Sequence, residues 1–316
     1  MALSDSRGAA DLQIYLSRQI HFDTKFPTSR GVFFYISPNS DKEGNPVLRV
    51  CALNDAHFIF LYSDGVRFAI DRKGREIWGD WPDGYSLEDA CTYLIGPVIA
   101  FVLRLRGAVC LHASSIAIGG RAIVLVGESG AGKSTTAAAF ARLGFPILSD
   151  DVAVLSGQGG RFLVQPGHPR INLWADSVEE LFGSKDALPR ISPTWDKRYL
   201  ALGGDAHRFQ AAPLPLGAVF VLGERADTVT VPIAGEFGAN EALMTLIANT
   251  YVNYLLDAEM RRRDFETLSR VAANVPVRRI RPAGDCSKVF ELCEAIFAGA
   301  RELESWDMTD TAMKAR

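Results

Sequence analysis

The chain has few features of a membrane protein or of a disulfide-linked secreted protein. Its longest nearly apolar run, Tyr93 to Leu103, covers eleven residues and contains Gly96 and Pro97, whereas a bilayer-spanning helix needs about 20 residues. Five cysteines are an odd number, and none stands in a C-x-x-C spacing, so neither a zinc knuckle nor a disulfide framework is predicted. The first residues lack the charged-then-apolar order of a signal peptide. These absences favour a cytoplasmic protein and predict no membrane partner.

An excess of basic residues is also lacking. Lys and Arg together number 34 and Asp and Glu 37, which gives a net charge of −3. No overall positive field attracts a polyanion, so no nucleic-acid partner is predicted. The 316 residues are 48% hydrophobic and 22% charged, an ordinary globular composition. The length suffices for one large domain or for two of ordinary size.

The first part of the chain consists of short strand-like pieces between turn signals. Strands are predicted at 31–36, 47–53, 58–62 and 66–70, the last two joined by the hairpin signal Ser63-Asp64-Gly65. We expect a small β-rich N-terminal domain over residues 1–90. A helical bridge over 91–107 should follow, with its helix beginning at Ser86 and interrupted at Pro97.

From residue 108 onward, strand and helix patterns alternate, which is typical of an α/β fold. Strands are predicted at 121–126, 145–148, 152–155, 162–164 and 218–222. Helices are predicted at 134–143 and near 236–248, 258–273 and 286–300. The α/β domain therefore extends over 108–300, and residues 301–316 form a polar tail.

The strongest functional signal is the segment Gly127-Glu128-Ser129-Gly130-Ala131-Gly132-Lys133-Ser134, which matches G-x-x-x-x-G-K-[ST] between an apolar strand and a helix. Glycines let successive backbone N–H groups surround phosphate oxygens, and the helix directs its positive end at them. Lys133 can reach the β- and γ-phosphates, and the Ser134 hydroxyl can bind Mg²⁺. We therefore expect ATP and Mg²⁺ as cofactors. The predicted nucleotide-binding residues are Gly127, Glu128, Ser129, Gly130, Ala131, Gly132, Lys133, Ser134 and Thr135.

A pair of carboxylates follows this loop. Asp150 and Asp151 lie seventeen and eighteen residues after Lys133, at the end of the next predicted strand. One carboxylate can hold Mg²⁺, and the other can take a proton from an attacking hydroxyl. An acidic turn without function is the alternative, but the position directly after the loop and its helix favours the functional interpretation.

His112 precedes Lys133 by twenty-one residues and, taken alone, is more often structural than catalytic. Together, Leu111-His112, the glycine-rich loop and Leu148-Ser149-Asp150-Asp151 resemble the kinase domain of HPr kinase/phosphorylase. That family has a His, then G-x-S-G-x-G-K-S, then a paired Asp, at similar spacing. The resemblance implies a P-loop kinase domain of the HPr-kinase and PEP-carboxykinase type. It also implies that His112 and Lys133 lie in the active site, that Asp151 accepts the proton, and that Ser134 and Asp150 hold the metal.

The resemblance covers roughly residues 108–183, including Pro169-Arg170-Ile171-Asn172-Leu173 and Leu181-Phe182-Gly183. Where the family places a Mg²⁺-binding Glu, this chain has Val164 and Gln165, so the second metal ligand stays unassigned. The family's Arg-rich phosphorolysis loop is missing, and phosphorolysis is not expected. Four basic residues could replace a transition-state cation, although surface solvation is the simpler interpretation of each: Arg170, Lys197, Arg198 and Arg208.

The leading hypothesis is therefore a Mg-ATP-dependent kinase that transfers the γ-phosphoryl group to a serine hydroxyl of a peptide or protein. The β-rich N-terminal region is similar to that of HPr-kinase-related proteins from bacterial gene clusters, some of which resemble kinases of lasso-peptide precursors. This similarity implies a peptide-tailoring role as a narrower hypothesis, and the family's symmetric oligomers imply a homo-oligomer. Two alternatives stay open: a small-molecule phosphoryl transferase, related to phosphoenolpyruvate carboxykinases, and a non-catalytic nucleotide-sensing module.

Overall fold

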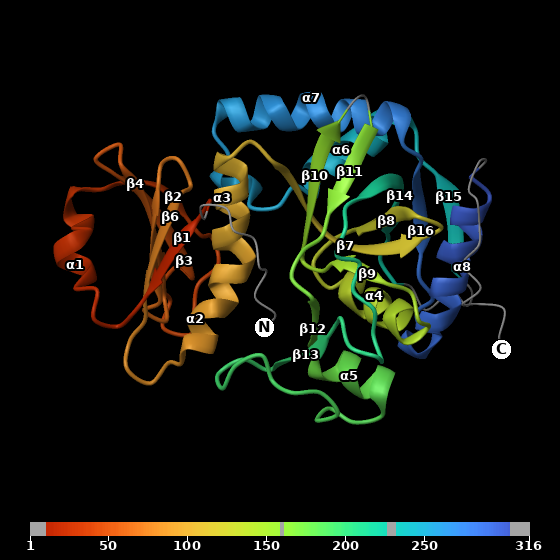
Figure 1. The fold of residues 1–316 in the computed structure, drawn as a ribbon, viewed down its shortest axis with the longest axis horizontal. Coiled ribbons are helices and arrows are strands. Elements are labelled where there is room, and N and C mark those ends of the chain that lie inside the picture. The colour runs from red at the N-terminus through yellow and green to blue at the C-terminus, as the bar shows by residue number, and fades with distance from the viewer. Residues whose placement is uncertain (1–10, 159–160, 226–231, 304–316) are drawn as a thin grey trace.

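The computed structural model describes residues 11–158, 161–225 and 232–303 (Figure 1). These residues form two large β-sheets with helices packed against them, so the α/β fold class is confirmed. The predicted limits of the domains at 90, 107 and 300 stay predictions. In the described part of the chain, no helix combines the length and the apolar composition that crossing a bilayer requires.

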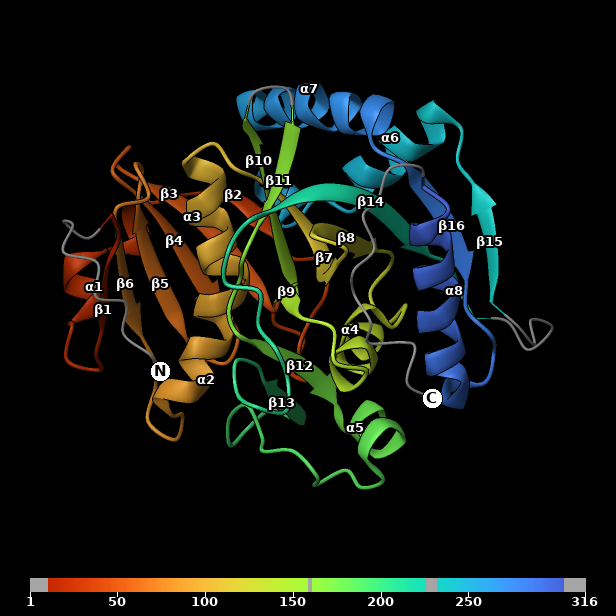
Figure 2. The ribbon, with the colours of Figure 1, turned by 45° about the vertical axis from the view of Figure 1, so that its right-hand side comes forward.

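The N-terminal sheet has six strands in the order β1-β6-β5-β4-β3-β2 (Figure 2). Neighbouring strands are antiparallel except β1 and β6, which are parallel. Four of the strands match predicted ones. The other two are not predicted, because β1 has only four residues and β6 carries Glu76 and Asp80 at its ends and Gly79 between them. The strands are β1 (Gln13–Leu16), β2 (Val32–Ile36), β3 (Leu48–Leu53), β4 (His57–Tyr62), β5 (Arg67–Asp71) and β6 (Glu76–Asp80), with the short helix α1 (Phe22–Lys25) after β1.

A broken helix covers one face of this sheet. It consists of α2 (Leu87–Tyr93), a π-helical turn (Leu94–Val98) and α3 (Ile99–Leu105). Ser86 and Asp89 cap its start reciprocally, because each side chain accepts a hydrogen bond from the backbone N–H of the other. The interruption expected from Pro97 is present, and Gly96 there has a non-helical backbone (φ −89°, ψ −105°).

The larger sheet has eight strands in the order β11-β10-β7-β8-β14-β16-β15, with β9 also paired to β7. The central strands β8, β14 and β16 are parallel. Side chains alternate along β8: Ile123 and Leu125 join one apolar cluster, and Val124 and Val126 join the other. The strands are β7 (Val109–Ile118), β8 (Arg121–Val126), β9 (Ile147–Ser149), β10 (Val152–Gln158), β11 (Arg161–Gln165), β14 (Leu214–Leu222), β15 (Ile233–Glu236) and β16 (Val277–Arg281).

Helices cover both faces of the larger sheet (Figure 1). Residues of α4 (Lys133–Arg142) and α8 (Val289–Arg301) belong to the first cluster. Residues of α6 (Ala239–Ala248) and α7 (Ala258–Asn274) belong to the second. All four helices are close to the predicted ones, because each carries an apolar face that the period of 3.6 residues makes visible.

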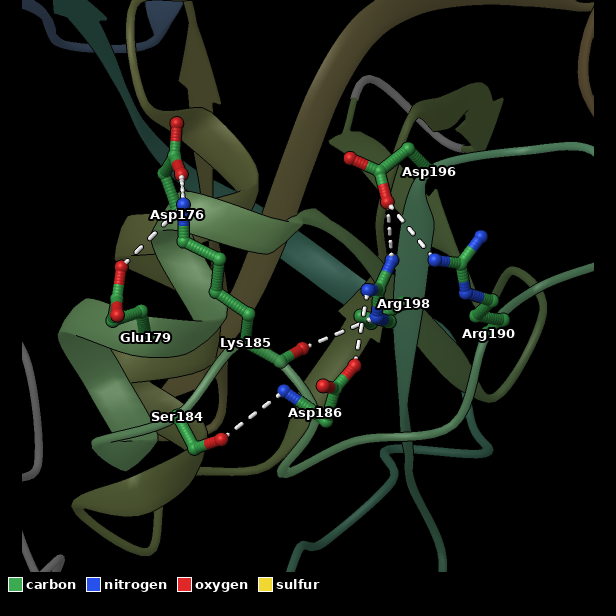
Figure 3. Close-up of polar contacts among 8 residues, drawn as sticks. All are labelled: Asp176, Glu179, Ser184, Lys185, Asp186, Arg190, Asp196 and Arg198. Atoms are coloured by element: carbon green, nitrogen blue, oxygen red, sulfur yellow. Dashed lines mark hydrogen bonds and ion pairs between the residues drawn. The ribbon is translucent and has the colours of Figure 1, made fainter.

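A small unit below the larger sheet consists of the two-stranded sheet β12 (Arg170–Trp174) and β13 (Lys197–Ala201) and the helix α5 (Ala175–Phe182). Figure 3 shows that Arg198 fixes the connection between α5 and β13. Its guanidinium donates to the Lys185 carbonyl (3.1 Å), to Asp196 (2.8 Å) and to Asp186 (3.3 Å). The Arg198 side chain is 4% exposed, so the expectation of a solvated surface cation is wrong. The N–H donors of Arg198 therefore hold the connection between α5 and β13 in place.

The N-terminal sheet and the broken helix share apolar packing with the segment that follows α6. Val252 and Leu255, which follow α6, belong to the same buried cluster as Leu94, Val98 and Phe101 of the broken helix. Beside this cluster, Arg104 of α3 forms a doubly hydrogen-bonded ion pair with Asp264 of α7, and both side chains are almost fully buried. The broken helix is therefore anchored to the N-terminal sheet on one side and to the α6–α7 region on the other.

Candidate functional site

The glycine-rich loop connects β8 to α4 in the way the sequence predicts. Gly127 has φ +151°, and a Cβ there would lie 2.7 Å from the carbonyl oxygen of Leu222 on β14, so only glycine fits. Gly132, directly before α4, has φ +95°. The N–H groups of Gly130, Gly132 and Lys133 donate to no other residue in the described part of the chain. Free N–H groups at the start of a helix are an arrangement that favours an anion.

Lys133 lies largely buried inside the loop. Its Nζ donates to the carbonyl oxygens of Gly127 (2.8 Å) and Glu128 (3.0 Å), which uses two of the three ammonium donors. Burial lowers the pKa of Lys133, while Asp151 and Asp150 oppose that shift. The loop therefore holds a cation beside free backbone donors.

The two carboxylates reach the site because of the pairing along β7. β9 and β10 both run antiparallel to β7, with Ser149 opposite Ser115 and Val152 opposite His112. The turn between them, Asp150-Asp151, must then lie beside the stretch of β7 that carries His112 and Ser114. Because residues two apart on a strand share a face, both of these side chains are near the carboxylates.

Asp150 is enclosed by donors. Its carboxylate accepts from the Ser114 hydroxyl (2.7 Å), from the backbone N–H of Asn172 (3.1 Å) and from Ser134. Burial raises the pKa of Asp150, and the neighbouring Asp151 charge adds to the shift, although these hydrogen bonds act against it. A bound cation would favour the ionised form of this carboxylate.

Asp151 is fixed in a strained turn with φ +70°, an unusual backbone conformation for a residue other than glycine. One carboxylate oxygen is 3.3 Å from His112 Nδ1, and the other accepts from the Tyr251 hydroxyl at 2.8 Å. Burial would raise the pKa of Asp151, but the hydrogen bonds and charge interactions with these partners lower it below its usual value. Asp151 is therefore an ionised carboxylate at neutral pH, held from two sides.

The interruption of the broken helix lies close to the same carboxylate. A Cβ at Gly96 would lie 3.4 Å from the Tyr251 hydroxyl and 3.5 Å from Asp151 Oδ2. The next residue, Pro97, lines a cavity beside the loop. The segment between the two sheets thus supplies one wall of the site, although no residue before 108 is predicted to contribute to it.

Two cavities meet at His112 and at the Ser129-Gly130 part of the loop. The smaller, about 170 Å³, is lined by His112, Lys133, Ser134 and Asp151 among others. The larger, about 1290 Å³, lies between the loop, the end of β14 and residues 248–254. The first is small and lined mostly by polar residues, and the second exceeds the volume usual for sites that hold drug-sized ligands.

Oxygen atoms that could hold Mg²⁺ surround the smaller cavity. The Ser134 hydroxyl and the Asp150 carboxylate are adjacent, and Asn172 lines the same cavity. The Asn172 Oδ1 atom is buried and has no hydrogen-bond partner in the described part of the chain. Hydroxyl, carboxylate and amide oxygens are ligands that Mg²⁺ accepts, so the donor set fits this ion. No group of three or more His, Cys, Asp or Glu side chains suitable for a metal occurs among the described residues.

Most of the predicted site residues come together. The smaller cavity is lined by His112, Ser129, Gly130, Gly132, Lys133, Ser134, Thr135 and Asp151, and the larger by Gly127, Glu128 and Ala131 as well. Asp150 lies behind them, bonded to Ser134. Of the four cations considered, Lys197 alone lines the smaller cavity, whereas Arg208 is exposed elsewhere and the Arg170 guanidinium faces the Tyr199 ring at 6.0 Å.

Besides Gly96, Pro97 and the ligand role of Asn172, the sequence does not predict three further residues of the site. Ser114 could have been found, because it lies two positions after His112 on the same strand. Tyr251, which holds Asp151, lies one hundred residues further along the chain and has no local signature. Asn249 accepts a hydrogen bond from the Gly127 N–H (3.0 Å) and thereby fixes the start of the loop.

Comparison with known proteins adds little. No protein-family model matches the chain, and no curated protein matches it. Among solved structures, the HPr(Ser) kinase/phosphatase from Coxiella burnetii is similar at 14% sequence identity and a TM-score of 0.31, over 61% of this chain and 98% of that one. A likeness at this level shows neither a shared fold nor a shared function.

Proposed function

We propose that the protein is a Mg-ATP-dependent kinase that transfers the γ-phosphoryl group of ATP to a hydroxyl. The acceptor oxygen forms a bond to the γ-phosphorus, the bond from that phosphorus to the bridging oxygen breaks, and ADP leaves. The hydroxyl proton passes to the Asp151 carboxylate. This reaction needs positioning and charge stabilisation more than covalent help from the protein.

Different residues have different roles in this reaction. The loop N–H groups and Lys133 hold the phosphates, and Ser134, Asp150 and Asn172 would hold Mg²⁺, which supplies charge neutralisation at the phosphate oxygens. His112 and Tyr251 position Asp151, which leaves the remaining lone pairs of its carboxylate available to the acceptor hydroxyl.

One observation carries the proposal. The ionised Asp151 carboxylate and the cation-bearing loop line one cavity, and the carboxylate is anchored by side chains from two distant segments. An acidic turn without function needs no such support. A nucleotide sensor needs a phosphate site but no anchored proton acceptor, which makes this alternative weaker.

A finer proposal is that the fold is of the HPr-kinase type and that the acceptor is a serine of a peptide or protein. It rests on the motif resemblance and on the larger cavity, which exceeds what a small metabolite needs. A small-molecule acceptor is the competing outcome of the experiment below.

The test uses the full chain with Mg²⁺ and γ-labelled ATP, offered serine-containing peptides, the protein HPr and a panel of small alcohols. Label on a peptide or protein serine supports the proposal, and label on a small alcohol replaces the acceptor class. The matched control is Lys133→Ala, which removes the loop cation and should abolish transfer. ATP binding without transfer to any acceptor, and without hydrolysis, would overturn the kinase assignment in favour of a sensor.

A further inference from the structure

The strand β2 forms one edge of the N-terminal sheet and is unusually apolar for an exposed edge. Its five residues, Val-Phe-Phe-Tyr-Ile, include no charge, whereas edge strands in proteins are normally protected by lysine, proline or a covering segment. The exposed fractions are 73% for Val32, 40% for Phe33, 45% for Phe34 and 56% for Ile36. A row of backbone donors and acceptors therefore lies open beside apolar side chains.

The pairing with β3 shows which groups are free. Ser37 N–H donates inward to the Leu48 carbonyl (2.9 Å). Because backbone groups alternate along a strand, the N–H and C=O of Ile36 point away from β3. A shift in register between Phe33 and Tyr35 interrupts the ladder at that point. The open edge thus offers hydrogen bonds to an added strand over a short length only.

This edge is continuous with the candidate active site. The Tyr35 ring of β2 stacks on the Tyr254 ring at 4.4 Å between centroids and 26° between planes. Tyr254 lines the larger cavity together with Tyr251 and His112, the two side chains that hold Asp151. The strand β2 therefore adjoins, through Tyr35, the wall of the cavity that also contains His112 and Tyr251.

We propose that β2 docks the peptide substrate by strand addition, with apolar residues of the peptide contacting Val32, Phe33 and Ile36 and a serine beyond them entering the larger cavity past Tyr254. This inference rests on the proposed kinase function. The occupant is an extended segment with alternating apolar side chains, on one side of the serine. Main-chain hydrogen bonds then supply affinity, and the exposed side chains supply selectivity.

A second copy of the chain fits the edge less well. Five residues at about 3.3 Å each give a pairing of about 16 Å, and the break at Phe34 shortens the regular part. A stable dimer usually buries at least about 1,200 Å², which a strand pair of this length does not supply alone. The opposite edge, β1, exposes Ile14, but Tyr15 there stacks on Trp78 at 4.0 Å, and neither lines the cavities.

The test measures binding separately from phosphoryl transfer. The probes are two fluorescein-labelled peptides that contain Thr-Val-Thr-Val-Thr and a four-glycine linker, with the serine at the C-terminal end of one and at the N-terminal end of the other. Their binding is followed by fluorescence anisotropy without ATP. We expect one orientation to bind, and V32K/I36K to raise its Kd at least tenfold, while Ile14→Lys on the opposite edge changes it less than twofold.

The outcomes separate this inference from the function. Peptide binding that V32K/I36K abolishes, without transfer of phosphate to this or any other peptide, supports the docking edge and overturns the proposal that the acceptor is a peptide serine. Transfer to a peptide with the same KM and kcat in V32K/I36K overturns the docking edge and keeps the kinase. A change from dimer to monomer in V32K/I36K, with peptide binding unaltered, assigns the edge to a second copy and overturns the inference. If V32K/I36K unfolds, V32T/I36T replaces it, because threonine is β-branched and suits a strand. A change in the peptide Kd of less than threefold in V32T/I36T would then contradict docking at β2.

Discussion

Replacement of Asp151 by asparagine separates its chemistry from its structural role. The turn at Asp151 has φ +70°, a region in which Asn and Asp are several-fold enriched over other non-glycine residues. The asparagine oxygen can still accept the hydrogen bond from Tyr251. We therefore expect Asp151→Asn to fold and to bind ATP like the unaltered protein.

The rate should nevertheless fall. A positioned general base contributes about 10²–10⁴ in rate, which corresponds to about 3–5 kcal/mol of barrier at 1.36 kcal/mol per factor of ten. An amide cannot accept the proton, so Asp151→Asn should lose this factor in kcat. Single-turnover transfer of labelled phosphate, with substrates saturating, measures it without interference from product release.

Asp151→Ala is the matched comparison. Alanine in the left-handed region costs about 1–2 kcal/mol, and the Tyr251 hydroxyl loses its acceptor. We expect a similar loss of rate and a lower Tm than for Asp151→Asn. An Asp151→Asn variant that retains the full transfer rate would refute the assignment of Asp151 as proton acceptor, and equal Tm values for Asn and Ala would refute the argument from the strained turn.

Three further substitutions test other contacts described above. Tyr251→Phe removes a hydrogen bond that lowers the pKa of Asp151, so the pKa should rise. Because the carboxylate can accept a proton only above its pKa, the acid limb of the rate–pH profile should move to higher pH. An acid limb that stays in place would contradict this prediction. Arg104→Met leaves Asp264 buried without its partner and should cost about 3–5 kcal/mol of unfolding free energy in urea titration, whereas the exposed control Arg262→Met should cost under about 1 kcal/mol. Gly127→Ala should clash with the Leu222 carbonyl and weaken ATP binding at least tenfold by calorimetry; wild-type affinity would show that the loop tolerates a Cβ.

The parts of the site that sequence predicts are those that local backbone geometry creates. The loop 127–134 needs glycines at fixed offsets between a strand and a helix, and that pattern is visible in the chain. The position of Asp150 and Asp151 beside His112 arises instead from two strands that share one edge of β7. Only the motif resemblance indicated this proximity, because pairing partners are not written locally in the sequence.

The fold, too, has elements that local sequence patterns predict and elements that they do not. Helices α4, α6, α7 and α8 carry an apolar period and are predicted closely, whereas β12 and β13 pair across twenty-two intervening residues and are not predicted. Arg198 is the clearest example of a residue whose environment the sequence does not predict. A charged residue on a short strand is typical of a solvated surface, and only the three acceptors that converge on its guanidinium explain its burial.

The broken helix makes the two halves of the molecule difficult to exchange. Gly96 lies close to Asp151 and Pro97 lines the larger cavity, while Val98 and Phe101 are packed with Val252 and Leu255. A fragment that begins at residue 108 would expose this apolar surface and leave Asp151, which is already partly exposed, more open to water on the side of Gly96. Grafting the N-terminal half of a related protein onto this one would therefore transplant part of the cavity wall, and recombination between relatives should succeed only where residues 94–101 and 251–255 are inherited together.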